Sequence, residues 1–239
     1  MITRTVLTEQ LDQILQLLSS YTNLTAKNIR LTNEAFCGDS EASEMILAAA
    51  KKGEKLRSDI ESSCLDVLLL QQPLIGDDLR FVTASFRVVS DISRVDSMSR
   101  DIAFLVHEMP SNIAACIAEP IENMAELTSH MVVSAVDAFQ ASDVAVAESV
   151  IAADQQINEL YAQCEHDIVE LIRSKTSSAS YLPELLMIAK YFERIGDHAK
   201  RIASWAIFRA TGRRRTGLGQ VTDILFEDEG KGADSTLRG

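Results

Sequence analysis

Long stretches in which apolar residues recur every three or four positions dominate this chain. The first stretch is marked by Leu7, Leu11, Ile14, Leu15 and Leu18, a spacing that places all five on one face of a helix. Residues that break helices are scarce, because the 239 residues include only 10 glycines and 4 prolines. Aromatic residues make up only 5% of the chain. This combination favours an all-α protein and argues against an all-β one.

Glycine and proline divide the helical pattern into six long segments. Three fall in residues 1–109 and three in residues 110–211, and Pro110 marks the boundary between these two predicted domains. Asp77 or Asp78 is expected to cap the third helix, since an aspartate accepts hydrogen bonds from the free N–H groups of a first turn. The low aromatic content predicts two slim three-helix bundles rather than one thick core.

The two halves look like a tandem repeat. At an offset of 100 residues, Arg94 matches Arg194 and Ala103 matches Ala203. Residues 212–239 differ from both halves, because they hold six of the ten glycines and show no apolar periodicity. The expected fold class is therefore all-α, with two tandem three-helix bundles followed by a disordered C-terminal tail.

The chain is acidic. Lys and Arg total 23 and Asp and Glu total 35, which gives a net charge of −12, and residues 212–239 contribute five charges of each sign. The whole excess therefore lies on the helical body, and no nucleic-acid partner is expected, because phosphate backbones bind basic surfaces. The sequence has no apolar stretch of about 18 residues and no apolar signal-peptide core at its N-terminus. We therefore expect no membrane span and a cytoplasmic location.

Two pairs of oxygen-bearing side chains indicate a candidate cation site. Glu193 and Asp197 are four residues apart on the sixth helix, so their like charges share one face and repel each other. Gly196 between them costs a helix about 1 kcal/mol relative to alanine, which a sequence selected for stability alone has little reason to accept. Asp154 and Asn158 form a similar pair on the fifth helix. Such a set suits a hard cation such as iron, manganese or magnesium.

Other interpretations of this segment stay open at the level of the sequence. The acidic face is equally consistent with a solvated surface on which Arg194 and Lys200 supply the counter-charges. His198 follows Asp197 directly, so it points about 100° away around the helix and is expected at a surface or an interface. No histidine stands three residues after a glutamate, as a ferritin-like di-iron site requires, and no nucleophile motif is present.

Three features together resemble the PhoU family of accessory regulators of the bacterial phosphate-specific transporter. They are the six-helix duplication and the segments Glu193-Arg-Ile-Gly-Asp-His-Ala199 and Gln71-Gln-Pro-Leu-Ile-Gly-Asp-Asp-Leu-Arg80. The resemblance covers about residues 1–211. It implies paired three-helix bundles, usually dimeric, with E/D-x-x-x-D motifs that hold metal ions. That motif is matched in the second bundle only, since Ser93 and Ser97 stand at its positions in the first.

The resemblance also implies a function. The chain would be a non-enzymatic negative regulator of phosphate starvation signalling and phosphate uptake. Its implied partners are the sensor histidine kinase of the phosphate regulon and the ATPase subunit of the phosphate ABC transporter, with a homodimer as the assembly. The alternatives are a metal-binding structural adaptor and, less favoured, a ferritin-like metal-dependent enzyme.

Overall fold

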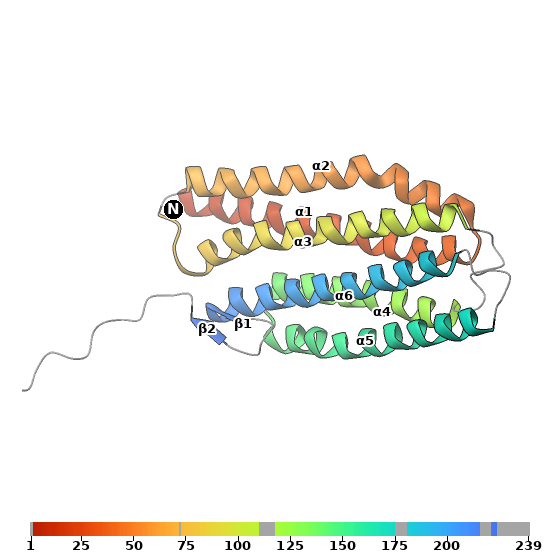
Figure 1. Ribbon diagram of the computed structural model, residues 1–239. Helices are drawn as coiled ribbons and strands as arrows, with labels where there is room; N and C mark the ends of the chain where they lie inside the picture. Colours follow the sequence, from red (N-terminus) through yellow and green to blue (C-terminus); the bar gives the residue numbers. More distant parts are fainter. Residues whose placement is uncertain (1, 72, 110–117, 175–180, 216–220, 224–239) are drawn as a thin grey trace, which may run out of the picture.

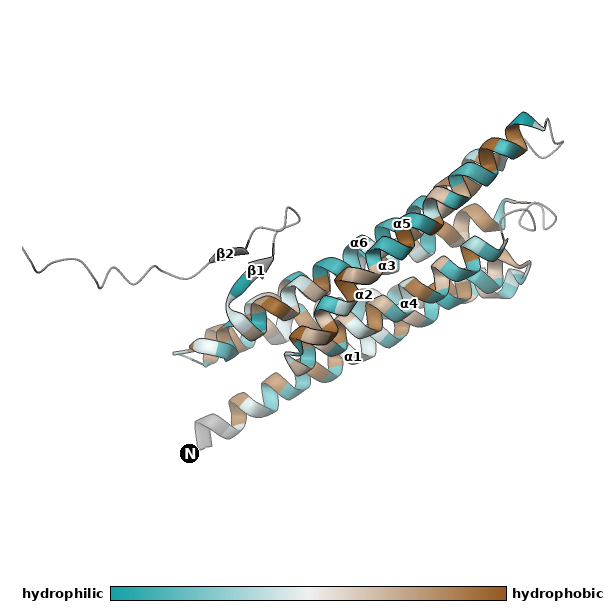
Figure 2. Ribbon diagram, turned by 90° about the horizontal axis from the view of Figure 1, so that it is seen from below, coloured by the Kyte–Doolittle hydropathy of each residue, from teal (hydrophilic) through white to brown (hydrophobic). Residues whose placement is uncertain are grey.

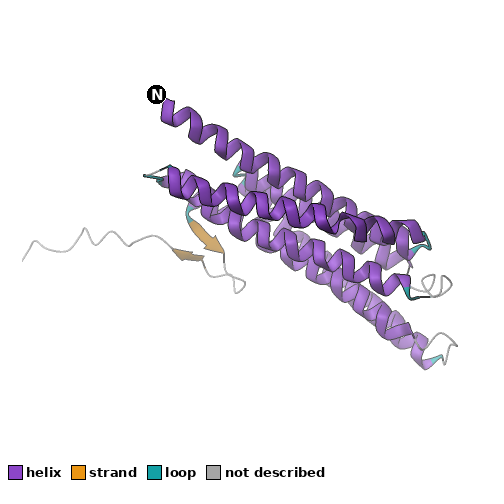
Figure 3. Ribbon diagram, turned by 90° about the horizontal axis from the view of Figure 1, so that it is seen from above, coloured by secondary structure: helices purple, strands orange, loops and turns teal. Residues whose placement is uncertain are grey.

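The chain folds into six long helices. The computed structural model describes residues 2–71, 73–109, 118–174, 181–215 and 221–223. The helices are α1 (Ile2–Phe36), α2 (Ser40–Leu70), α3 (Gly76–His107), α4 (Ala118–Ala141), α5 (Val144–Arg173) and α6 (Leu182–Thr211). Figure 3 shows them as the body of the molecule, with two short strands beyond α6. The predicted fold class, six long helices built as an internal repeat, is confirmed.

The helix ends follow from local hydrogen bonding. Asp143 caps α5, because its side chain accepts a hydrogen bond from the backbone N–H of Val146 at 3.1 Å. The end of α6 is a left-handed glycine, Gly212, with φ 73°. The expected cap at Asp77 or Asp78 is wrong, because α3 already begins at Gly76. Both aspartates lie instead in the first turn, where negative charge is favourable beside the helix dipole.

The helices form two antiparallel bundles that lie against each other, α1–α3 above and α4–α6 below in Figure 1. The bundles meet because α1 packs against α4 and α3 packs against α6. Apolar residues alternate with polar ones along each helix, as Figure 2 shows. The buried apolar residues of the two bundles join in one core that extends from Ile14 to Ile207. The two predicted three-helix bundles thus share a core, because the facing helices bury apolar residues against each other.

One contact between two helices occurs in both bundles. A glycine lies on one side of it and a larger residue on the other, and the glycine is on opposite sides in the two bundles. In the first bundle the small residue is Gly53 on α2, and it faces Asp96 on α3. In the second bundle the small residue is Gly196 on α6, and it faces Ile157 on α5. The third and sixth helices match at an offset of 100, so Asp96 and Gly196 are equivalent positions.

Two short strands follow α6. β1 (Arg213–Arg215) pairs antiparallel with β2 (Val221–Asp223), with Arg214 opposite Thr222. These six residues lie within the predicted tail, where their backbones pair with each other. The rest of the predicted tail and the predicted boundary at Pro110 lie outside the described residues. Among the described helices, none has both the length and the apolar character that crossing a membrane requires.

Candidate functional site

A lysine lies between the two predicted acidic pairs of the second bundle. The ammonium of Lys200 on α6 donates to Oδ2 of Asp154 on α5 at 2.5 Å and lies 2.8 Å from Oδ1 of Asp197. The amide nitrogen of Asn158 is 3.5 Å from the same Asp154 oxygen. Antiparallel packing of α5 and α6 therefore brings these three predicted residues together, with a protein cation between the carboxylates.

Glu193, the fourth predicted residue, has a different neighbour. The ammonium of Lys190 is 2.9 Å from its Oε2, and this ammonium also lies 4.9 Å from the centre of the Tyr161 ring. Oε2 is buried and lacks a well-directed hydrogen bond among the described residues, so the lysine neutralises Glu193 by proximity alone. Each acidic residue of the predicted site thus has a lysine beside it.

The protonation of Lys200 reflects both of its partners. Burial opposes a charged ammonium and by itself lowers the pKa of Lys200. The hydrogen bonds to Asp154 and Asp197 favour the charged form and outweigh burial, so the pKa of Lys200 is raised overall. Lys200 therefore remains a cation in this cluster at neutral pH.

The equivalent part of the first bundle holds a buried polar cluster. Asp96 on α3 is only 3% exposed, accepts a hydrogen bond from Nδ2 of Asn28 on α1 at 2.9 Å and forms an ion pair with Arg100. Arg100 also donates to the hydroxyl of Ser97 at 3.0 Å. Ser93 is buried nearby. The two serines thus accompany an internal network rather than a surface carboxylate pair.

The pKa of Tyr21 reflects the burial of the Asp96 cluster. Burial, together with the negative charge of Asp96, raises the pKa of Tyr21 to about 12. The phenol therefore stays neutral well above physiological pH.

A second polar cluster joins the two bundles. His198 Nδ1 on α6 lies 2.8 Å from Oδ1 of Asp91 on α3, and Arg201 approaches the same oxygen at 3.1 Å. Asp91 is almost completely buried in spite of its charge. As expected, His198 points away from Asp197 and into an interface. Its partner was missed, because the sequence does not show which face of α3 meets α6.

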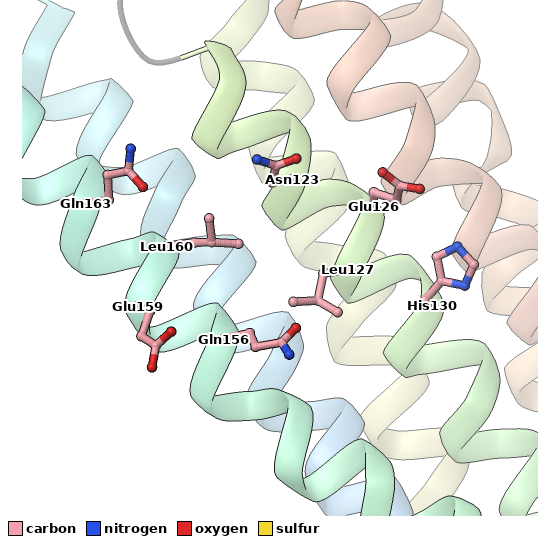
Figure 4. Close-up of a pocket in the computed structure, with 8 residues that line it drawn as sticks. All are labelled: Asn123, Glu126, Leu127, His130, Gln156, Glu159, Leu160 and Gln163. Atoms are coloured by element: carbon pink, nitrogen blue, oxygen red, sulfur yellow. The ribbon is translucent and has the colours of Figure 1, made fainter.

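A surface hollow lies in a groove between α4 and α5. Its volume is about 560 Å³. In Figure 4, Leu127 from α4 and Leu160 from α5 point toward each other, while Glu126 and His130 point away toward α1. Glu126 and His130 also line a second hollow of about 440 Å³ between α1 and α4, which contains Arg30. The first hollow carries two glutamates and the second has mixed charge, and neither has a nucleophile paired to a base among the residues that line it.

The sequence profile of the PhoU domain matches the chain twice, over residues 9–106 and 121–206. This chain belongs to the PhoU family. The two matches correspond to the bundles α1–α3 and α4–α6, so the internal repeat is a duplicated PhoU domain.

Curated relatives and solved structures agree with the family. A phosphate-specific transport system accessory protein PhoU homolog of Zymomonas mobilis is 28% identical over 221 residues, 92% of this chain and 93% of the relative. A PhoU homolog of Clostridium acetobutylicum is 24% identical and covers 74% of this chain and 80% of its own length. The phosphate transport system regulatory protein PhoU of Streptococcus pneumoniae superposes with a TM-score of 0.78 at 25% identity, and it covers 86% of this chain and 97% of that structure.

The metal ion that the PhoU resemblance implies was tested against these side chains. Hard cations bind several converging oxygens, and Asp154, Asn158 and Asp197 supply such oxygens. As the side chains lie, however, Lys200 fills the place between the two carboxylates. Within the described ranges, no three acidic, histidine or cysteine side chains gather as a metal site requires. The arrangement is a lysine-centred ion-pair cluster, and the predicted metal site stays a prediction.

Proposed function

We propose that this PhoU-family chain is a negative regulator of phosphate starvation signalling and of phosphate transport, and that it contributes to phosphate homeostasis in the cell. The observation that carries the proposal is the pair of PhoU domains, which together extend from residue 9 to residue 206. Relatives that match most of the chain are named as accessory proteins of the phosphate-specific transport system.

We infer that the partners are the sensor histidine kinase of the phosphate regulon and the ATPase subunit of the phosphate ABC transporter. The chain would bind both at the cytoplasmic face of the membrane, as a homodimer. Its net charge of −12 supports association with basic partner surfaces. Such association weakens as salt rises, because exposed charges are screened over about 10 Å at 0.1 M ionic strength.

Deletion of the gene tests the regulatory proposal. In medium rich in phosphate, we expect the deletion strain to express phosphate-starvation genes that the parent represses, and a plasmid copy to restore repression. Repression that continues without the gene would refute the proposal. A structural adaptor outside this system would also pull down neither the kinase nor the transporter ATPase.

A bound metal is a separate proposal that does not affect the regulatory one. The candidate ligands are Glu193, Asp197, Asp154 and Asn158, and the oxygen donors and the helix pairing of α5 and α6 support it. The test compares the metal content of the purified chain with that of a Glu193→Ala/Asp197→Ala variant. Equal metal in the two proteins would exclude this site.

A further inference from the structure

We propose that the turn between α2 and α3 is a docking surface for a partner protein that presents apolar side chains flanked by lysine or arginine. We call this surface the α2–α3 knob, and its apolar residues are Leu65, Leu69, Leu70, Ile75 and Leu79. It lies at the end of the molecule where the N-terminus and the strands also lie (Figure 1). It contains part of the second PhoU-like segment of the sequence, which the regulatory proposal leaves without a role.

The apolar exposure at the knob is unusual. Leu69, Leu70 and Ile75 are 71%, 69% and 73% exposed, the three highest values among the large hydrophobic residues described. Leu65, one helical turn before Leu69, is 51% exposed. Apolar side chains that gather at one exposed place mark an interaction surface rather than ordinary surface composition.

The α2–α3 knob contains an apolar hollow that is lined in part by residues packed against the core. A hollow of about 510 Å³ is lined by Leu68, Pro73, Leu74 and Leu79. Leu68 and Leu74 also pack against the core, so the hollow has a fixed floor. Its apolar lining suits contact with an apolar side chain of a partner.

Two long-range hydrogen bonds hold the knob in place. Gln71 donates to the side-chain oxygen of Gln10 on α1 at 2.9 Å. Arg80 donates from Nε to the backbone carbonyl of Arg209 on α6 at 3.0 Å. The exposed leucines are thus presented by a turn tied to both bundles.

The charges around the knob identify the chemistry of its partner. Asp66 is exposed and Asp78 is half-buried, and neither forms an ion pair with a described residue. Asp77 is 3.7 Å from Arg80, whose Nε is already bound to α6. An apolar surface with carboxylates at its rim is complementary to apolar side chains flanked by cations.

The same charges disfavour three other occupants. A second copy of this chain would place like carboxylates against each other. An anionic membrane would repel them, and repel a chain of net charge −12. The segment Ile224-Leu225-Phe226-Glu227-Asp228-Glu229 is apolar, but it also carries three acidic residues. A basic protein partner is therefore favoured over all three.

This inference rests on the proposed function, which supplies the probes. The probes are the purified phosphate ABC transporter with its ATPase subunit and the cytoplasmic part of the sensor kinase. The variant is Leu69→Gln/Leu70→Gln/Ile75→Gln in the full-length chain. The matched control is Phe104→Gln/Val169→Gln/Ile172→Gln, which removes exposed apolar side chains at the opposite end of the bundles. Circular dichroism and thermal melting verify that both variants fold.

We expect the knob variant to bind one probe about tenfold or more weakly, as loss of interface anchors does, and the control to bind within about twofold of the wild type. Asp66→Asn/Asp78→Asn is expected to reduce the salt dependence of binding to that probe. If the wild-type chain binds neither probe, the proposed function fails and this inference fails with it. If the wild type binds and the knob variant binds equally well, only the docking surface is refuted.

Three further measurements address the other occupants, and each positive result would overturn the inference. The first is sedimentation of the wild type, but not of the knob variant, with phosphatidylcholine vesicles that contain phosphatidylglycerol. The second is a change of oligomeric state in the knob variant by light scattering. The third is about tenfold tighter probe binding after removal of residues 224–239, which would identify the tail as the occupant.

Discussion

The exchanged glycines of the repeat give a sharp test of how tightly the first bundle is packed. We consider Gly53→Ala and Gly196→Ala, two substitutions inside long helices. A methyl group on Gly53 would lie 2.9 Å from Oδ2 of Asp96, closer than such contacts ordinarily come. A methyl group on Gly196 would lie 3.4 Å from Cγ2 of Ile157, an ordinary van der Waals contact with an apolar side chain.

The magnitudes follow from these neighbours. Replacing glycine by alanine inside a helix stabilises it by about 1 kcal/mol. We expect Gly196→Ala to keep most of that gain. At Gly53, the carboxylate of Asp96 must move away from Asn28 and Arg100, and hydrogen bonds to charged groups are worth about 1.5–3 kcal/mol each. If one of these bonds is lost and the helical gain is kept, Gly53→Ala lowers the free energy of unfolding by about 0.5–2 kcal/mol.

Urea unfolding followed by far-UV circular dichroism measures both variants against the wild type at constant slope. Gly53→Ala should have a lower midpoint and Gly196→Ala an equal or higher one. Gly53→Ala in an Asp96→Ala background serves as the control, because the clash disappears there and only the helical gain remains. A Gly53→Ala protein as stable as the wild type would show that Asp96 moves freely, and the reasoning from its burial would be wrong.

Four other predictions concern the polar clusters and the thiols. Urea unfolding of Asp91→Ala, His198→Ala and the double variant should give a coupling free energy of about 1.5–3 kcal/mol between the two side chains. Additive effects would mean that this contact does not hold the bundles together. Lys200→Met removes the cation between two carboxylates, so it should bind Mn²⁺ more tightly than the wild type in calorimetric titration; equal affinity would contradict this. Burial raises the pKa of the Cys64 thiol from 9.0 to about 12. In a variant whose only cysteines are Cys37 and Cys64, a thiol reagent should therefore label the exposed Cys37 quickly and Cys64 only after unfolding. Because the unfolded chain releases this proton first, the free energy of unfolding should fall as pH rises from 9.0 toward 12, by up to ~1.4 kcal/mol per pH unit, and a flat profile in that window would refute the assignment.

The six helices were predictable because their cause is local. Apolar residues at helical spacing and a few breakers are enough to place three helices in residues 1–109 and three in residues 110–211, as found. The start of α3 was missed by a residue or two, since the backbone enters the helix at Gly76 without a side-chain cap. How the two bundles share a core could not be predicted, for another reason. It depends on how two amphipathic bundles rotate against each other, and helical periodicity carries no information on that rotation.

In the candidate site, too, local spacing was predictable and the contacts set by tertiary packing were not. Asp154 and Asp197 were predicted to meet because antiparallel neighbouring helices bring their faces together, and they do meet. Spacing alone did not determine whether a metal or a lysine would neutralise them, and the structure has Lys200 there. Asp91 and His198 are 107 residues apart and belong to different bundles. The sequence indicated only that an aspartate and a histidine are able to pair, and many other residues of this chain could pair in the same way.

The repeat explains why the second bundle has an acidic surface cluster at positions where the first bundle has an internal network. Arg100 and Lys200 are equivalent, and each contacts the residue three positions before it, Ser97 or Asp197. In the first bundle the cation also binds the buried Asp96, so Arg100 is drawn inward and is 17% exposed. In the second bundle the position of Asp96 is occupied by Gly196, which offers no carboxylate. Lys200 therefore reaches across to α5 and remains 33% exposed. The difference between Asp96 and Gly196 thus determines where the cation of the repeat binds. It is held by a buried carboxylate in the first bundle, and in the second it stays at the surface, where a partner or an ion can compete for its carboxylates.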